Sequence, residues 1–209
     1  LTLTRILRER ELFVENLILK EEMERQERLR LLNNELVKKV SEVNTLNRVM
    51  EDFAAIDSSY EIFNKVVRLG VEELKADLVF FHVYSEQDSS LVLVDKAGAK
   101  NKKYPAPYVV DIPEQEKAFI IESLGNDHTP CLISDASGIP SMKGQVRSFM
   151  VAPLKIRDKI FGVVSAYIFQ GPHFFEGQGL YYLNFITQKA ASCIENIALY
   201  ENIYENLFS

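Results

Sequence analysis

Cysteine is scarce in this sequence: Cys131 and Cys193 are the only two, and neither lies in a Cys-x-x-Cys or His-rich pattern. This usage argues against a disulfide framework or a zinc site and suits a reducing cytoplasm. No apolar run approaches the roughly 18 residues of a transmembrane helix, and no signal-peptide pattern opens the chain. We therefore expect a cytoplasmic protein with no membrane span and no metal site.

Positive charge is also limited, because 30 Asp and Glu residues outnumber 24 Lys and Arg residues and give a net charge of −6. No cluster of basic residues alternates with aromatic residues, so we expect no nucleic-acid partner. Hydrophobic residues make up 47% of the 209 residues, which is enough for one folded domain with an extension.

Proline and glycine are absent from the first 55 residues, where charged residues alternate with leucine. From Leu29 to Phe53 apolar residues recur at the two core positions of a heptad, with Lys39 as the one exception. A seam repeating every seven residues needs a partner helix, so we predict a coiled coil over residues 1–56. The alternative is a long solvated helix that pairs only downstream. The predicted dimer contacts here are Leu29, Leu32, Leu36, Val43, Leu46 and Met50.

The remainder, residues 57–209, reads as one globular domain. Ser58 and Glu61 form a capping box that opens a helix, and Asp111 is the predicted cap of a helix over residues 113–124. A short charged turn joins two apolar runs into a hairpin. The predicted strands are residues 77–84, 91–97, 109–110, 132–135, 148–156 and 160–168, and the last helix covers residues 180–207.

This order of elements predicts an α+β fold. We expect an antiparallel sheet of about five to six strands, with the first and last helices of the domain on one face. A ligand pocket covered by loops and a helix is expected on the other face. The last helix carries a second heptad seam, which predicts further dimer contacts at Leu183, Ile186, Ala190, Cys193, Ile197, Tyr200 and Tyr204.

Residues 57–200 resemble a GAF domain, the small-molecule sensor module of phosphodiesterases, phytochromes and bacterial signalling proteins. The resemblance is carried by the runs 149–154 (FMVAPL) and 160–163 (IFGV), by 174–176 (FFE), and by Ala190-Ala191 and Glu195-Asn196. Gln178 stands where the family usually has an acidic residue. The resemblance implies a dimeric cytoplasmic sensor within a bacterial signalling protein.

Two further stretches resemble linkers of two-component signalling proteins. Residues 10–16 are similar to the helix that follows the receiver domain of a response regulator, and residues 200–206 are similar to a helix leading into an output domain. The resemblance therefore implies that the chain is a piece of a longer protein. Its expected partners are an upstream receiver and a downstream HD-GYP phosphodiesterase or histidine kinase domain.

The ligand of such a sensor is not identified by the sequence. The Asp-Glu dipeptide of cyclic-nucleotide-binding relatives is absent, and neither cysteine has the histidine neighbour that bilin attachment needs. His82 could bind haem iron from its apolar strand, although a hydrogen-bonded core histidine is the commoner arrangement. The candidate ligand-binding residues are His82, Tyr104, Tyr108, Phe119, Ser134, Asp135, Arg147 and Ser148; alternatively, these side chains simply cover the sheet.

Three functions are consistent with these features. The first is a small-molecule sensor that passes a change in helix packing to an output domain, which requires a ligand with different affinities for two arrangements. The second is a structural relay that binds nothing, which a pocket closed by large side chains would favour. The third is a reductase that depends on Cys131, which requires a stabilised thiolate. We expect no enzymatic activity, and the cofactor is unknown.

Overall fold

The computed structural model describes the backbone of residues 2–54, 56, 58–85, 87–125, 127–142 and 144–208. Within these ranges, side chains are described from Glu15 to Ala198 except at residues 59 and 60, and also at Arg8 and Phe13. The chain divides into two compact units, Leu1–Thr45 and Leu46–Ser209. The elements are α1 (Thr2–Ala54), α2 (Ser59–Leu74), β1 (Leu78–Ser85), β2 (Ser90–Gly98), η1 (Ala106–Val109), α3 (Glu114–Leu124), β3 (Cys131–Ile133), η2 (Pro140–Met142), β4 (Ser148–Ile156), β5 (Lys159–Ile168) and α4 (Gly177–Phe208).

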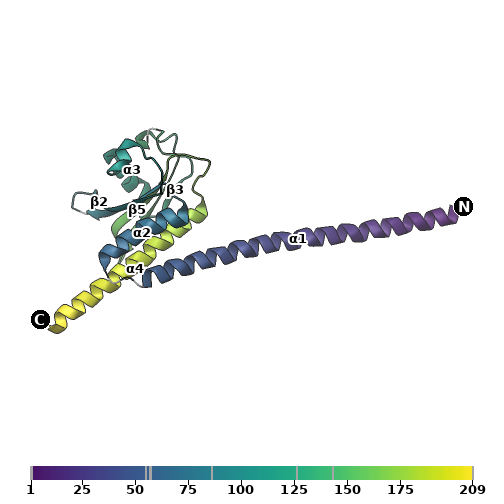
Figure 1. The fold of residues 1–209 in the computed structure, drawn as a ribbon, viewed down its shortest axis with the longest axis horizontal. Helices are drawn as coiled ribbons and strands as arrows, with labels where there is room; N and C mark the ends of the chain where they lie inside the picture. The colour runs from purple at the N-terminus through teal and green to yellow at the C-terminus, as the bar shows by residue number, and fades with distance from the viewer. Residues whose placement is uncertain are drawn as a thin grey trace. The chain divides into compact units, whose positions relative to one another are not determined.

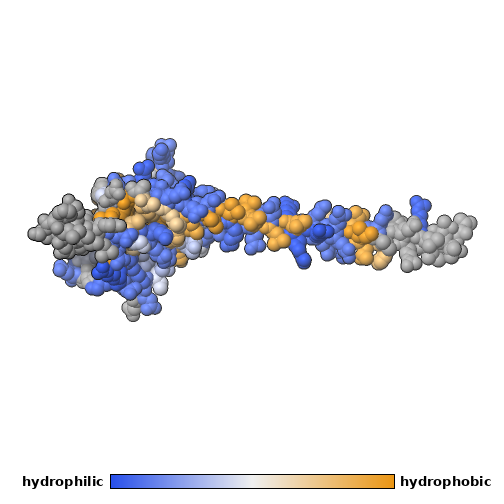
Figure 2. Space-filling view, turned by 90° about the horizontal axis from the view of Figure 1, so that it is seen from below, coloured by the Kyte–Doolittle hydropathy of each residue, from blue (hydrophilic) through white to orange (hydrophobic). Residues whose placement is uncertain are grey.

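Helix α1 is continuous, as expected from a segment without helix breakers. Many of its large apolar side chains are exposed, and Figure 2 shows them as a broken line of hydrophobic patches along the helix. These exposed side chains contact no partner helix within the single chain described, so the coiled coil remains a prediction. The exposed apolar side chains of the first unit are Phe13, Leu17, Ile18, Leu19, Met23, Leu29, Leu31, Leu32, Leu36, Val37, Val40 and Val43.

The second unit is built on a five-stranded antiparallel sheet in the order β2-β1-β5-β4-β3 (Figure 1). Strands β4 and β5 form the predicted hairpin, and the two turn residues Arg157 and Asp158 both have positive φ, as tight hairpin turns require. The antiparallel α+β fold predicted from the sequence is confirmed. Strands β2 and β3 form the two edges.

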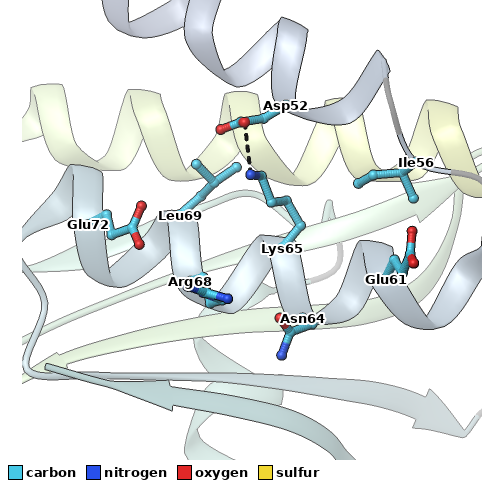
Figure 3. Close-up of a pocket in the computed structure, with 8 residues that line it drawn as sticks. All are labelled: Asp52, Ile56, Glu61, Asn64, Lys65, Arg68, Leu69 and Glu72. Atoms are coloured by element: carbon cyan, nitrogen blue, oxygen red, sulfur yellow. Dashed lines mark ion pairs between the residues drawn. The ribbon is translucent and has the colours of Figure 1, made fainter. Parts of the chain in front are cut away.

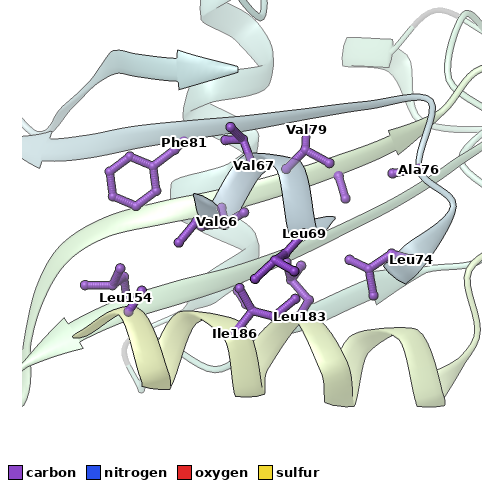
Figure 4. Close-up of a cluster of buried hydrophobic side chains, with 14 of the residues drawn as sticks. Val66, Val67, Leu69, Leu74, Ala76, Val79, Phe81, Leu154, Leu183 and Ile186 are labelled. Carbon is purple, nitrogen blue, oxygen red and sulfur yellow. The ribbon is translucent and has the colours of Figure 1, made fainter. Parts of the chain in front are cut away.

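Helices α2 and α4 cover one face of this sheet (Figure 1). The Ser58 hydroxyl accepts the backbone N–H of Glu61 at 3.3 Å, which confirms the predicted cap of α2. Figure 4 shows Leu69 of α2 beside Leu183 and Ile186 of α4, within a core that also receives side chains from β1 and β4.

The last turns of α1 belong to this core, because Val49 and Phe53 are buried in it. In α4 the heptad residues Leu183, Ile186 and Ala190 are fully buried in the same core. These three side chains are not available to a partner helix, which corrects that part of the predicted dimer seam.

The later residues of the α4 seam are either less buried than these three or lie outside the described side chains. Cys193 and Ile197 are partly buried against the core. The side chains of Tyr200 and Tyr204 lie outside the described residues. The seven-residue spacing in the first part of α4 therefore records its packing on its own domain.

The opposite face of the sheet is covered by residues 104–124, which we call the lid; it contains η1 and α3 (Figure 1). The predicted strand over residues 109–110 is wrong, since Pro105 begins a 3-10 turn in which the Tyr108 N–H bonds to the Pro105 carbonyl. The Val109 and Val110 carbonyls instead accept hydrogen bonds from Lys96. Among the described residues, none of the helices combines the length and the apolar character needed to cross a membrane.

Candidate functional site

Large aromatic side chains fill the space between the lid and the sheet, where the sequence predicts a ligand pocket. Tyr108 of the lid, Phe80 of β1, Phe149 of β4 and Tyr167 of β5 are fully buried. The Tyr167 ring lies 5.2 Å from that of Phe149, 5.4 Å from that of Tyr108 and 5.7 Å from that of Phe80, measured between centroids. Contacts at these separations are those of packed aromatic rings. For Tyr108 this arrangement favours the alternative in which the candidate residues cover the sheet.

His82 is fully buried on β1 and joins the sheet to the lid. Its Nε2 atom donates to the Asp111 carboxylate at 2.7 Å, and the Lys117 ammonium reaches the other carboxylate oxygen at 2.8 Å. Burial lowers the pKa of His82 despite the opposing effect of Asp111. Although burial acts against it, the hydrogen bonds from Lys117 and His82 lower the pKa of Asp111. The Nε2 atom is therefore engaged by a carboxylate and not open to haem iron, while the Nδ1 atom is buried without a partner among the described residues.

Asp111 is a residue whose role the sequence misassigned. The residue before α3 is Pro113, which provides no side-chain cap, so the predicted capping role of Asp111 is wrong. Its carboxylate is held instead by His82, by Lys117 and by the Ile112 N–H. The signal that could have identified this pairing is the presence of a histidine in an apolar strand, because a buried imidazole needs a hydrogen-bond partner.

Glu116 lies in the first turn of α3 and points at the sheet, with only 1% of its surface exposed. Its Oε1 atom accepts a hydrogen bond from the Tyr108 hydroxyl. Burial raises the pKa of Glu116 to about 7. Burial, the hydrogen bond and the negative charge of Glu116 raise the pKa of Tyr108, and burial together with Glu116 raises that of Tyr167.

Sequence reasoning missed Glu116 because acidic residues in the first turn of a helix are usually exposed there. The signal that could have identified it is its spacing. Glu116, Ile120 and Leu124 recur every four residues and occupy the same helix face, and the two apolar members predict that this face is buried.

Two of the candidate ligand residues, Ser134 and Ser148, have structural partners. The Ser148 hydroxyl donates to the Ile133 carbonyl at 3.2 Å and accepts the Phe175 N–H at 3.0 Å. The Ser134 hydroxyl donates to the Phe175 carbonyl at 3.1 Å. Both serines therefore fix the segment that leads into α4.

Asp135 and Arg147 are brought together at the rim of the lid face, where they line a groove of about 300 Å³. The Arg147 guanidinium lies 4.2 Å from the centroid of the Phe174 ring, and its Nε atom is buried without a partner among the described residues. The Asp135 carboxylate accepts the Ser137 N–H at 3.0 Å. The groove thus combines a cation, an anion and an aromatic wall. Its other lining residues are Gly144, Val146 and Phe169.

The last two candidates lie elsewhere on this face. The Tyr104 hydroxyl donates to the Ala99 carbonyl at 2.8 Å, and the Phe119 ring lies 6.4 Å from that of Phe149. The structure therefore brings only Asp135 and Arg147, out of the eight candidates, into one groove.

A second hollow, of about 490 Å³, follows α2 beside the end of α1. Figure 3 shows the Lys65 ammonium paired there with the Asp52 carboxylate, at 2.8 Å. Its charged residues carry both signs and none of them is a predicted site residue. The lining consists of Asp52, Ile56, Glu61, Asn64, Lys65, Arg68, Leu69 and Glu72.

The two cysteines show no sign of activation. Both are free, one on β3 and the other on α4. Burial raises the pKa of Cys131 and of Cys193, whereas a nucleophilic cysteine needs a lowered pKa. Within the described part of the chain, no group of three or more His, Cys, Asp or Glu residues is placed to hold a metal ion.

No family model matches the sequence, and no curated protein matches it. Solved structures do match the fold. The GAF domain of a phosphoenolpyruvate-protein phosphotransferase from Acinetobacter has a TM-score of 0.60 at 16% identity, covering 78% of this chain and 98% of that one. The corresponding domain from Coxiella burnetii has a TM-score of 0.60 at 15% identity and covers 77% of this chain and 96% of its own.

A third similar structure comes from Synechocystis, where a GAF domain in its photoproduct state has a TM-score of 0.58 at 15% identity. That match covers 70% of this chain and 99% of that one. At these identities the likeness shows the fold, and the fold is that of a GAF domain.

Proposed function

We propose that this chain is a regulatory module of a bacterial signalling protein, and that it forms a homodimer through its flanking helices and relays conformational changes along them. In this proposal it acts in the cytoplasm and has no catalytic activity of its own. It would lie between an upstream receiver and a downstream output domain, either an HD-GYP phosphodiesterase or a histidine kinase. The resemblance of residues 10–16 and 200–206 to the linkers of such proteins supports this placement.

The observation that carries the dimer is the line of exposed apolar side chains on α1 (Figure 2). Leu29, Leu36 and Val43 are spaced by seven residues, with Leu32 three residues after the first of them, and more than half of each side chain is exposed. Exposed apolar surface on this scale marks an interaction site. A second copy of the same helix is the partner that this spacing fits, because it presents the same seam.

The relay is supported by contacts inside the second unit. Phe53, in the last turn of α1, packs in the core that also receives α4, and the Cys193 thiol lies 3.8 Å from the Phe53 carbonyl. The helix that enters the domain thus contacts the helix that leaves it. A change in the packing of either helix would alter the other, as a bistable element coupling two sites must do.

The aromatic filling between lid and sheet supports a relay in preference to a sensor with a large preformed pocket on that face. Tyr108 and Tyr167 occupy the volume that such a ligand would need. The signal would then come from the neighbouring domains.

The dimer is tested by replacing Leu36 with Glu and measuring the molar mass by sedimentation at micromolar concentration. We expect a monomer, because two glutamates buried at the seam would repel each other and lose their hydration. Val37→Glu is the matched control, since Leu36 and Val37 are equally exposed, at 61% and 62%, but Val37 lies one position off the seam. We expect this control to remain a dimer. A dimeric Leu36→Glu variant, or a monomeric wild type, would overturn the proposed pairing.

A small-molecule sensor is the second candidate function, and the observation that favours it is the rim groove. There the Arg147 guanidinium stacks on Phe174 close to Asp135, in a space suited to a small polar ligand. Native mass spectrometry of the purified chain tests this candidate. A sensor predicts extra mass on the wild type that Arg147→Ala reduces at least tenfold in occupancy, whereas the same spectrum from both proteins, without extra mass, favours the relay.

A further inference from the structure

We propose that closure of the lid over the sheet is coupled to the uptake of one proton by Glu116. The domain would then respond to pH through the face of the sheet that the lid covers. This inference goes beyond the relay function and does not depend on dimerisation.

The surroundings of the Glu116 carboxyl group solvate a negative charge poorly. Its Oε1 atom has one donor, the Tyr108 hydroxyl, while its Oε2 atom is buried without a partner among the described residues. The Tyr167 hydroxyl is also buried nearby, and its interaction with Glu116 lowers the pKa of that carboxyl, but burial outweighs this effect. A buried carboxylate normally has several donors or a cation, because its charge is otherwise poorly solvated. A proton on the carboxyl removes that charge.

Two lysines near this site, Lys117 and Lys96, are engaged by groups other than Glu116. Lys117 is adjacent in sequence, but its ammonium contacts the Asp111 and Glu114 carboxylates, each at 2.8 Å. On β2, Lys96 is committed to the carbonyls of the lid. The titratable groups on the strands and turn around α3 are Tyr108 of η1, His82 and Tyr84 of β1, Asp95 and Lys96 of β2, Cys131 of β3, Lys155 of β4, and Lys159 and Tyr167 of β5; those on the lid itself also include Tyr104, Asp111, Glu114, Lys117 and Glu122.

The direction of the effect follows from the two pKa values. With the lid closed, the pKa of Glu116 is raised to about 7, whereas a solvated glutamic acid has a pKa of 4.5. Closure is therefore most favourable below pH 4.5 and is weakened as the pH rises through 7. The closed-to-open ratio should fall by about 300-fold in total between a pH well below 4.5 and a pH well above 7.

His82 acts in the opposite direction. Its pKa is lowered in the closed state, so a proton on His82 favours opening as the pH falls below the usual value of 6.5. The closed lid is thus best stabilised when Glu116 carries its proton and His82 does not. For this reason the test compares variants at each pH and does not rely on the wild-type profile alone.

The experiment is hydrogen–deuterium exchange of peptides from the lid in the full chain, between pH 5 and 8, corrected for the intrinsic exchange rate at each pH. We expect lid protection in the wild type to fall toward pH 8 by tenfold or more. Glu116→Gln should lose this alkaline fall, because the amide keeps the hydrogen bond from Tyr108 and carries no charge. Glu114→Gln is the matched control, since it removes the same charge from an 85% exposed side chain of the same helix, and it should follow the wild type.

A second variant keeps the proposal falsifiable if Glu116→Gln fails to fold. Tyr108→Phe removes the hydrogen bond that lowers the pKa of Glu116, so the fall in protection should move to higher pH. The proposal is overturned if Glu116→Gln retains the wild-type pH dependence, if Glu114→Gln removes it, or if Tyr108→Phe leaves its midpoint unchanged.

Discussion

At Gly162 the backbone of β5 lies close to the backbone of β1. A Cβ atom at this position would be 2.5 Å from the His82 carbonyl oxygen and 3.2 Å from the Phe81 ring. Real Cβ atoms do not come this close to a backbone oxygen, so a side chain here forces the two central strands apart. Glycine is required here because a larger side chain has no room, and the strand that would be displaced is β1, which carries His82.

We therefore expect Gly162→Ala to lower the free energy of unfolding by about 1–3 kcal/mol, the usual cost of overpacking a core. Urea denaturation followed by circular dichroism measures this change. Gly138→Ala is the control, because a Cβ atom there would meet nothing within 4 Å, and its midpoint should match that of the wild type. Equal midpoints for the two variants would contradict the close approach of β1 and β5.

Single residues were the least predictable part of the site. The sequence places Tyr108 on an irregular aromatic segment, but it cannot show whether such a ring lines a cavity or fills it. That outcome depends on Tyr167, which is 59 residues away and reaches the same space from β5. For the same reason Glu116 gave no signal by composition, since its burial is set by where the lid meets the sheet.

At the scale of the elements, the end of α1 packs in the core of the second unit. Phe53 is 4% exposed in the core, whereas Met50, one turn earlier, is 48% exposed. Val49 is buried as well, so the last turns of α1 have one face in the core and another, carrying Met50, that is exposed.

Phe53→Ala should destabilise the second unit by about 3–5 kcal/mol, as large-to-small core substitutions of phenylalanine do. Met50→Ala should have an effect several times smaller. Thermal unfolding of both variants, monitored by circular dichroism, gives the comparison. If the two melting temperatures fall equally, Phe53 does not contribute to the core as described.

Elements set by local sequence were predicted well. The Ser58 cap and the hairpin between β4 and β5 each depend on residues close together in the chain. The two heptad seams show the limit of local patterns. Both repeat every seven residues, yet the α1 seam is exposed from Leu29 to Val43, while Leu183, Ile186 and Ala190 of α4 are covered by the domain itself. Periodicity indicates that a face is buried without indicating which surface covers it.

At the scale of the whole molecule, the sequence predicted the α+β class and the placement of helices on one face of the sheet. It could do so because the order and the apolar patterns of the elements allow few layered arrangements. It could not predict that the opposite face would be closed by aromatic side chains. That feature depends on the fit of the lid to β1, β4 and β5, which involves contacts between distant parts of the chain.

The edges of the sheet determine which kinds of self-assembly are open to this chain. One edge strand, β3, has only three residues. The other edge strand, β2, carries Lys96, and lysine is a residue type that protects strand edges from pairing with another chain. The exposed apolar residues of α1, in contrast, lie on a helix whose backbone hydrogen bonds are internal. The proposed helix pairing would close at a defined number of copies, whereas strand addition can continue into fibres.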